Sequence, residues 1–218
     1  MDNSFAVGHI AFGYITSKTS AKLLKTNLNL PLILTLSVLP DIDLFLFKFT
    51  QHRGPTHSII AALIIFIPFF IIYRKKAIPY FIALAQHSLI GDYIGGGDVQ
   101  LLWPITHTGF GAGLDMRSLT SVSIELAMFL TAITIMLLQK DIHTLFRPHK
   151  TNLLLIIPAT TLLQAILPTA VPSPLKLPSY FLLAIFSAAI LAELHQTLSP
   201  KSKSSPSRPV PFPARTET

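Results

Sequence analysis

The chain has 218 residues, of which 50% are hydrophobic and only 12% are charged. Since soluble domains carry about 25% charged residues, this composition argues against a soluble domain. Cysteine is absent, which excludes disulfides and thiolate metal sites, so a metal ion could bind only through histidine nitrogen or carboxylate oxygen. The net charge of +7 is interpreted as setting membrane orientation, and nucleic acid is not an expected partner.

Seven apolar segments, separated by basic or proline-rich stretches, predict seven helices. In chain order they cover residues 4–17, 28–39, 58–73, 77–92, 121–138, 153–168 and 179–197. The predicted fold class is all-α, a polytopic transmembrane helical bundle of about six to seven helices. Several segments are shorter than the ~20 residues of a full span, so we expect some of them to lie at the membrane interface or inside the bundle.

Three parts are expected along the chain. Residues 1–105 hold the polar motifs described below, and residues 106–198 supply the C-terminal membrane helices. Residues 199–218 contain five prolines and four basic residues without an apolar period, which is typical of a disordered basic tail.

The basic residues predict how a seven-span chain lies in the membrane. Thirteen of the seventeen Lys and Arg residues fall on one side of such a chain, and this side is expected to be cytoplasmic. The prediction is a multi-pass protein of the cell membrane with its N-terminus outside and its C-terminus in the cytoplasm. Asp41, Asp43, His52, His57 and Asp92 then lie at the outer ends of their helices.

Polar residues interrupt the apolar first half of the chain in four places. These are Gly8-His9, Leu39-Pro-Asp-Ile-Asp43, His52-Arg-Gly-Pro-Thr-His57 and His87-Ser-Leu-Ile-Gly-Asp92. Ionisable side chains among membrane-type apolar runs are costly unless they pair, face water or bind an ion, so they indicate a functional site.

Less specific interpretations of the same residues stay open at this point. His9 alone fits a buried, hydrogen-bonded histidine. Asp41 and Asp43 fit a turn that caps a helix, and His52 and His57 fit a polar loop at the membrane surface. Elsewhere in the chain, Glu125 lies in an apolar run and needs a partner or contact with water.

The combination of LPDID, HRGPTHS and LLWP, in this order, resembles a known family. It is similar to the YdjM-like membrane-bound, metal-dependent hydrolases, described as LexA-binding, inner-membrane-associated hydrolases. The likeness covers about residues 5–105, and this family is itself similar to zinc-dependent phospholipase C and single-strand nucleases, which gather His and Asp around zinc. The resemblance implies that the metal ligands are His9, Asp41, Asp43, His52, His57, His87 and Asp92.

Physical arguments lead to a similar site. Seven ligands could supply two metal ions with three or four side chains each and leave positions for water or substrate. Zinc is the expected ion, although manganese or iron would tolerate the same nitrogen and oxygen donors. The expected catalytic nucleophile is a metal-bound water, and Arg53 would hold an anionic substrate through its planar, bidentate guanidinium.

Two local features refine these expectations. Thr56 is expected to cap the helix that follows, with His57 in its first turn. His87 and Asp92 lie five residues apart, about 140° around an α-helix. Either a distortion near Gly91 brings them together, or His87 hydrogen-bonds to a ligand rather than binding the ion.

The expected function is hydrolysis of an ester at the outer membrane surface, and the expected ester is a phosphoester of a lipid or lipid-linked molecule. Membrane lipids and an unidentified ester substrate are the expected partners. A non-catalytic membrane protein with a structural metal site is one alternative, and an ion channel or transporter is another, although these tend to place ionisable residues near the bilayer midplane. Regulatory protein binding, which the family description suggests, has no recognisable motif in the sequence.

Overall fold

The computed structural model describes residues 5–44, 52–95, 97–167 and 171–199. Within these ranges the chain is all-helical and contains no β-strand, so the predicted fold class is confirmed at this level. Each of the seven predicted segments contains a helix. The tail predicted at residues 199–218 lies outside the described residues except for Ser199.

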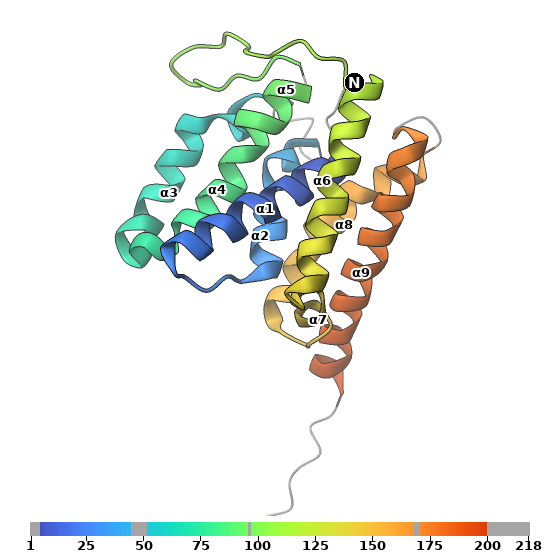
Figure 1. Cartoon of the computed structure of the whole chain (residues 1–218). Helices are drawn as coiled ribbons and strands as arrows, with labels where there is room; N and C mark the ends of the chain where they lie inside the picture. The colour runs from blue at the N-terminus through green and yellow to red at the C-terminus, as the bar shows by residue number, and fades with distance from the viewer. Residues whose placement is uncertain (1–4, 45–51, 96, 168–170, 200–218) are drawn as a thin grey trace, which may run out of the picture.

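The central element is helix α1 (Ala6–Leu24), which runs between the other helices (Figure 1). It packs against α4 (Ile78–Gln86) on one side and α6 (Leu119–Leu138) on the other. Glycine allows a further close approach, to the residue that follows α2 (Leu30–Leu36), because a Cβ atom on Gly13 would overlap the side chain of Ser37. Helix α1 therefore lies close to the segment that leads into the first acidic motif.

Short and irregular helices carry three of the four polar motifs, and the fourth, Gly8-His9, lies on the longer helix α1. The short helices are η1 (Leu39–Leu44), η2 (Pro55–His57), η3 (Arg74–Lys76), η4 (His87–Asp92), α5 (Tyr93–Gly95), α7 (Asp141–Leu145), η5 (Lys150–Leu155) and η6 (Leu163–Ile166). The remaining α-helices are α2 (Leu30–Leu36), α3 (Ile59–Tyr73), α8 (Ile156–Leu162) and α9 (Ser173–Leu198). Most of the short helices are 3₁₀-helices, but η4 is a π-helix.

One apolar core joins the two halves of the chain. Buried residues of α1 and α2, such as Ile10, Tyr14 and Leu34, pack in the same cluster as Phe129 of α6 and Phe186 of α9. The first half, which carries the polar motifs, is thus held in place by the C-terminal helices.

Two helices, α6 and α9, are long and apolar enough to cross a membrane, with 20 and 26 residues. Helix α3 is shorter, with 15 residues and no buried side chain. Ile64 and Ile72 on this helix are 62% and 68% exposed. Exposed apolar faces of this kind are rare on soluble monomers, and they suit contact with lipid.

Candidate metal centre

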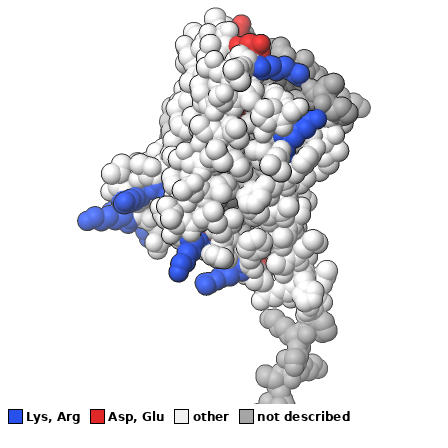
Figure 2. All heavy atoms as spheres, turned by 45° about the vertical axis from the view of Figure 1, so that its right-hand side comes forward, with Lys and Arg blue, Asp and Glu red and all other residues white. Residues whose placement is uncertain are grey.

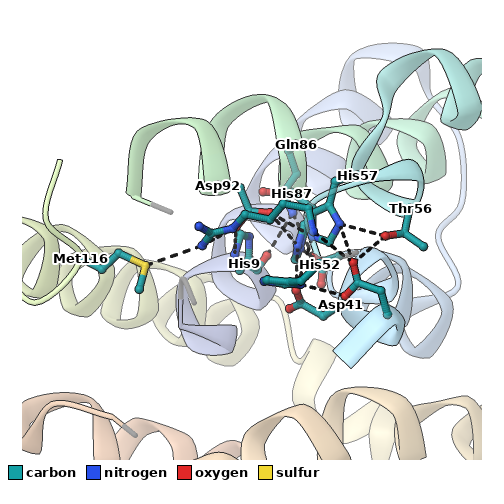
Figure 3. Close-up of polar contacts among 12 residues, drawn as sticks. His9, Asp41, His52, Thr56, His57, Gln86, His87, Asp92 and Met116 are labelled. Atoms are coloured by element: carbon teal, nitrogen blue, oxygen red, sulfur yellow. Dashed lines mark hydrogen bonds and ion pairs between the residues drawn. The ribbon is translucent and has the colours of Figure 1, made fainter. Parts of the chain in front are cut away.

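The polar motifs come together at one end of α1. His9 projects from α1, Asp41 and Asp43 from η1, and His57 from η2, and the residues of η4 complete the group (Figure 3). Residues that are up to eighty-three positions apart in the sequence (92 minus 9) therefore share one buried site. Here the term "central cluster" means Asp41, His57, His87 and Asp92.

Four atoms of the central cluster lie close to one another. His57 Nε2 lies 3.1 Å from Asp92 Oδ2 and 3.6 Å from Asp41 Oδ1. His87 Nε2 lies 3.3 Å from both of these oxygens. For a tetrahedral zinc ion with bonds of 2.0–2.1 Å, the distance between neighbouring ligand atoms is about 3.3–3.4 Å. The four measured distances span this value.

Each imidazole of the central cluster has one nitrogen atom, Nε2, that is available as a metal ligand. In the described part of the chain, Nε2 of His57 and Nε2 of His87 are buried and have no hydrogen-bond partner. A buried polar atom without a partner is costly, and a metal ion at the cluster would satisfy both nitrogens. The donor set, two imidazole nitrogens and two carboxylate oxygens, fits zinc, manganese or iron.

The opposite nitrogen of each imidazole is fixed by the protein. His87 Nδ1 lies 2.8 Å from the backbone carbonyl oxygen of Ser37, so its N–H donates to this oxygen. His57 Nδ1 lies 3.2 Å from Asp43 Oδ2. Metal-binding histidines commonly donate their second N–H to a carbonyl or carboxylate, which leaves the other nitrogen as a ligand. Both imidazoles follow this pattern.

Asp43 is engaged mainly by the surrounding protein. Its Oδ2 accepts hydrogen bonds from the hydroxyl of Thr56 at 2.7 Å and the backbone N–H of Arg53 at 3.3 Å. Its Oδ1 lies 2.9 Å from Nδ1 of His52. The carboxylate thereby connects η1 to the loop before η2 and orients His57.

The contact between Thr56 and Asp43 corrects the predicted helix cap. Ser58, not Thr56, caps α3, because its hydroxyl accepts from the backbone N–H groups of Ile60 and Ala61. Residues 55–57 form the separate 3₁₀-helix η2. The Thr56 hydroxyl donates to the buried carboxylate of Asp43 and is not available as a cap, so Ser58 caps α3 instead.

The spacing of His87 and Asp92 is explained by the π-helix η4. A π-helix forms hydrogen bonds between residues i and i+5, so residues five apart lie on one face. His87 Nε2 and Asp92 Oδ2 are accordingly 3.3 Å apart. Of the two alternatives, the local distortion that includes Gly91 is the one found, and such π-helical turns are frequent at functional sites.

His9 and His52 flank the central cluster. The ring of His9 stacks on that of His87 with centroids 3.8 Å apart, and its Nε2 lies 3.7 Å from Asp92 Oδ1. The described residues contain two groups of three whose potential ligand atoms lie within 4.8 Å of one another. One consists of His9, His87 and Asp92, and the other of Asp41, His52 and His57.

Gly91 makes the position of His9 sterically possible. A Cβ atom at residue 91 would overlap the imidazole of His9. We expect Gly91→Ala to displace His9 and to lower the affinity for zinc by about 10- to 100-fold, comparable with the loss of an orienting contact. Zinc titration of the purified variant measures this change.

Gly95→Ala is the matched control, because a Cβ atom at residue 95 would meet nothing within 4 Å. Its affinity for zinc should equal that of the wild type. Unchanged affinity in Gly91→Ala, with its helical content intact, would contradict a role of His9 beside the ion.

Arg53 is held beside the cluster in an unusual backbone conformation. Its φ is 62°, in the left-handed region that few non-glycine residues adopt. The carbonyl of Arg53 accepts a hydrogen bond from the N–H of Gln100 at 3.0 Å. Its Nη2 lies 3.8 Å from Asp92 Oδ1 and 4.0 Å from the sulfur of Met116. Such local strain often accompanies a functional position.

The charges of the site compensate one another. Burial alone would lower the pKa of His57, but the nearby carboxylates of Asp41, Asp43 and Asp92 outweigh this effect and hold the pKa well above its ordinary value. Burial likewise would raise the pKa of Asp41, but His87 and His57 lower it. The carboxylates of the site therefore stabilise a positive charge between them, and a divalent cation bound there would be stabilised in the same way.

Three contributors to the site were not identified from the sequence. The carbonyl of Ser37 and the steric role of Gly91 leave no signal in a single sequence, because a backbone acceptor can belong to any residue type. Glu125 did have a signal, as an acid in an apolar run. It accepts a hydrogen bond from the backbone N–H of Gly8 at 3.2 Å, and this contact fixes the start of α1 next to His9.

Comparison with known proteins gives one match. The model of a family described as "YdjM inner membrane protein" matches residues 5–170. Searches of curated proteins and of solved structures found no match. The matched range contains every residue of the central cluster and extends beyond residues 5–105, over which the sequence resemblance was drawn.

Proposed function

The chain belongs to the YdjM inner membrane protein family, and we propose that it is a membrane-bound, metal-dependent hydrolase of phosphoesters. The observation that carries this proposal is the convergence of two imidazole nitrogens and two carboxylate oxygens at distances of 3.1–3.6 Å. When bound, a divalent ion at such a site polarises an ester oxygen and lowers the pKa of water, the two contributions that hydrolysis needs.

Each residue of the metal centre has a separate role in this proposal. The central cluster would hold one ion, and His9 and His52, which belong to separate groups of candidate ligands, would each add a donor on one flank of it. Asp43 positions His57 by accepting its Nδ1–H. Arg53 binds the anionic group of the substrate, because its buried Nε has no hydrogen-bond partner among the described residues and its guanidinium can contact two phosphate oxygens.

A lipid or lipid-linked phosphoester is the proposed substrate. An apolar cavity of about 90 Å³ lies against His9 and Gly91. Phe5, Phe12 and Ile94 are among the residues that line it. A hydrophobic part of the substrate would fit this cavity while its phosphate contacts Arg53.

The membrane topology is proposed as multi-pass, with the site at the outer surface. The exposed apolar side chains of α3 support contact with lipid in addition to α6 and α9. We expect a reporter fused after Lys203 to be active in the cytoplasm, because most of the basic residues then lie on that side. Activity of this reporter only in an external location would contradict the orientation.

Metal analysis combined with an ester assay tests the function. The purified full chain should contain zinc, manganese or iron and should hydrolyse p-nitrophenyl phosphate or bis(p-nitrophenyl) phosphate. Asp41→Ala and His57→Ala should lose this activity, whereas His107→Ala, which alters an exposed histidine, should keep it. Bound metal without turnover would favour a structural metal site, and turnover that survives both variants would remove these residues from the reaction.

A further inference from the structure

A second cavity, of about 730 Å³, lies at the opposite end of α1 from the metal centre. It is lined by the C-terminal part of α1, the connection to α2, and residues around α7 and η5. His9 and Lys22 are thirteen positions apart on α1, which corresponds to about 20 Å. The cavity is thus separate from the proposed hydrolase site, and its volume is in the range of sites for small molecules.

The lining of this cavity carries uncompensated positive charge. Its only described acid, Asp141, accepts a hydrogen bond from the hydroxyl of Tyr14 at 2.7 Å and pairs with Lys18. Among the described residues, Lys22 and Arg147 also line the cavity and have no acidic partner. The lower part of the face in Figure 2 carries several Lys and Arg side chains and almost no acidic atoms. The cavity therefore favours an anion.

Two neutral side chains of the lining have unsatisfied polar atoms. Asn152 is 1% exposed, and its amide nitrogen donates to the carbonyl oxygens of Leu145 and Arg147 at 3.0 and 3.1 Å. These bonds fix the orientation of the amide, and its Oδ1 has no hydrogen-bond partner in the described chain. The same holds for the buried hydroxyl oxygen of Thr26. A carbonyl-type oxygen can only accept a hydrogen bond, so the missing partner of Asn152 is a donor.

We propose that this cavity binds a phosphorylated polyol, with its phosphate on Lys22 and Arg147 and its hydroxyl groups on Asn152 and Thr26. One ligand then satisfies both the cations and the unpaired oxygens. Two sources share this chemistry, namely a soluble polyol phosphate such as glycerol 3-phosphate and the headgroup of phosphatidylglycerol. Basic pockets between membrane helices are known sites for anionic headgroups.

Binding to the purified full chain tests the proposal in two arms. In the first, glycerol 3-phosphate is titrated in detergent, with inorganic phosphate and glycerol as partial ligands. In the second, retention of phosphatidylglycerol is compared with retention of phosphatidylcholine in mixed vesicles. We expect one arm to give specific binding, and the arm identifies the source. The double variant Lys22→Gln, Arg147→Gln should weaken it about thirty-fold, since each cation contributes about five- to sixfold.

Lys140→Gln is the matched control, because it removes a basic residue at the same end of the molecule that does not line the cavity. It should bind as the wild type does. Thr26→Val removes a polyol contact without changing the charge, and it should also weaken binding. It tests the proposal even if the double variant does not fold. Absence of binding in both arms, equal binding of inorganic phosphate, or equal loss in Lys140→Gln would overturn the proposal.

Discussion

Asp92→Asn is expected to lower the affinity for zinc by more than about 100-fold and to abolish hydrolysis. Loss of an outer contact alone costs about 10- to 100-fold, and Asp92 has more than one role at the site. Its Oδ2 lies 3.1 and 3.3 Å from the imidazole nitrogens of His57 and His87, and its Oδ1 lies 3.8 Å from Arg53. Zinc titration and an assay with bis(p-nitrophenyl) phosphate measure the two effects.

Asp98→Asn is the matched control, since it removes an exposed carboxylate six positions away. It should retain both zinc and activity. If Asp92→Asn bound zinc as tightly as Asp98→Asn does, the ion would not lie at the central cluster. Measurement of the thermal unfolding of both variants separates loss of metal from loss of fold.

Asp43→Asn is expected to lower the affinity for zinc by about 10- to 100-fold, the usual effect of removing a carboxylate that orients a metal-binding histidine. The carboxylate contacts the Thr56 hydroxyl and His57 Nδ1 through Oδ2, at 2.7 and 3.2 Å, and His52 Nδ1 through Oδ1, at 2.9 Å. An amide has one acceptor oxygen, so its NH2 group would face either His52 or the pair Thr56 and His57. In the second case His57 Nδ1–H has no acceptor at this position. His57 would then lose its fixed tautomer. A smaller effect than that of Asp92→Asn is expected, because Asp43 acts through His57.

The exposed residue Asp115 provides the control for this variant. Asp115→Asn should bind zinc with wild-type affinity. An Asp43→Asn variant that loses zinc as completely as Asp92→Asn would indicate that Asp43 is itself a ligand, as the family resemblance implies. An unchanged affinity would show that His57 needs no orienting carboxylate.

The composition was sufficient to predict the helical class, because the apolar segments are long and separated by basic or proline-rich stretches. It was less informative about their lengths. The segment predicted at 153–168 is divided into η5, α8 and η6. Local hydrogen-bonding choices of this kind depend on the neighbouring helices and are not encoded in hydropathy.

The sequence was sufficient to name the residues of the candidate site, but it did not predict how their side chains are arranged. The five-residue spacing of His87 and Asp92 left two alternatives open, a local distortion or a His87 that does not bind the ion directly, and the π-helix η4 is the distortion. In contrast, nothing in the sequence distinguished Asp41 from Asp43, which stand two positions apart. Tertiary contacts separate them, since Asp43 accepts from Thr56 and Arg53 while Asp41 faces the imidazoles of the central cluster.

A zinc-loaded structure with anomalous scattering data at the zinc edge would show whether the central cluster binds the ion. We expect an anomalous peak surrounded by His57 Nε2, His87 Nε2 and one carboxylate oxygen each of Asp41 and Asp92, at about 2.0–2.2 Å from each atom. A peak bound elsewhere, or no peak in protein that retains its fold at saturating zinc, would contradict this expectation.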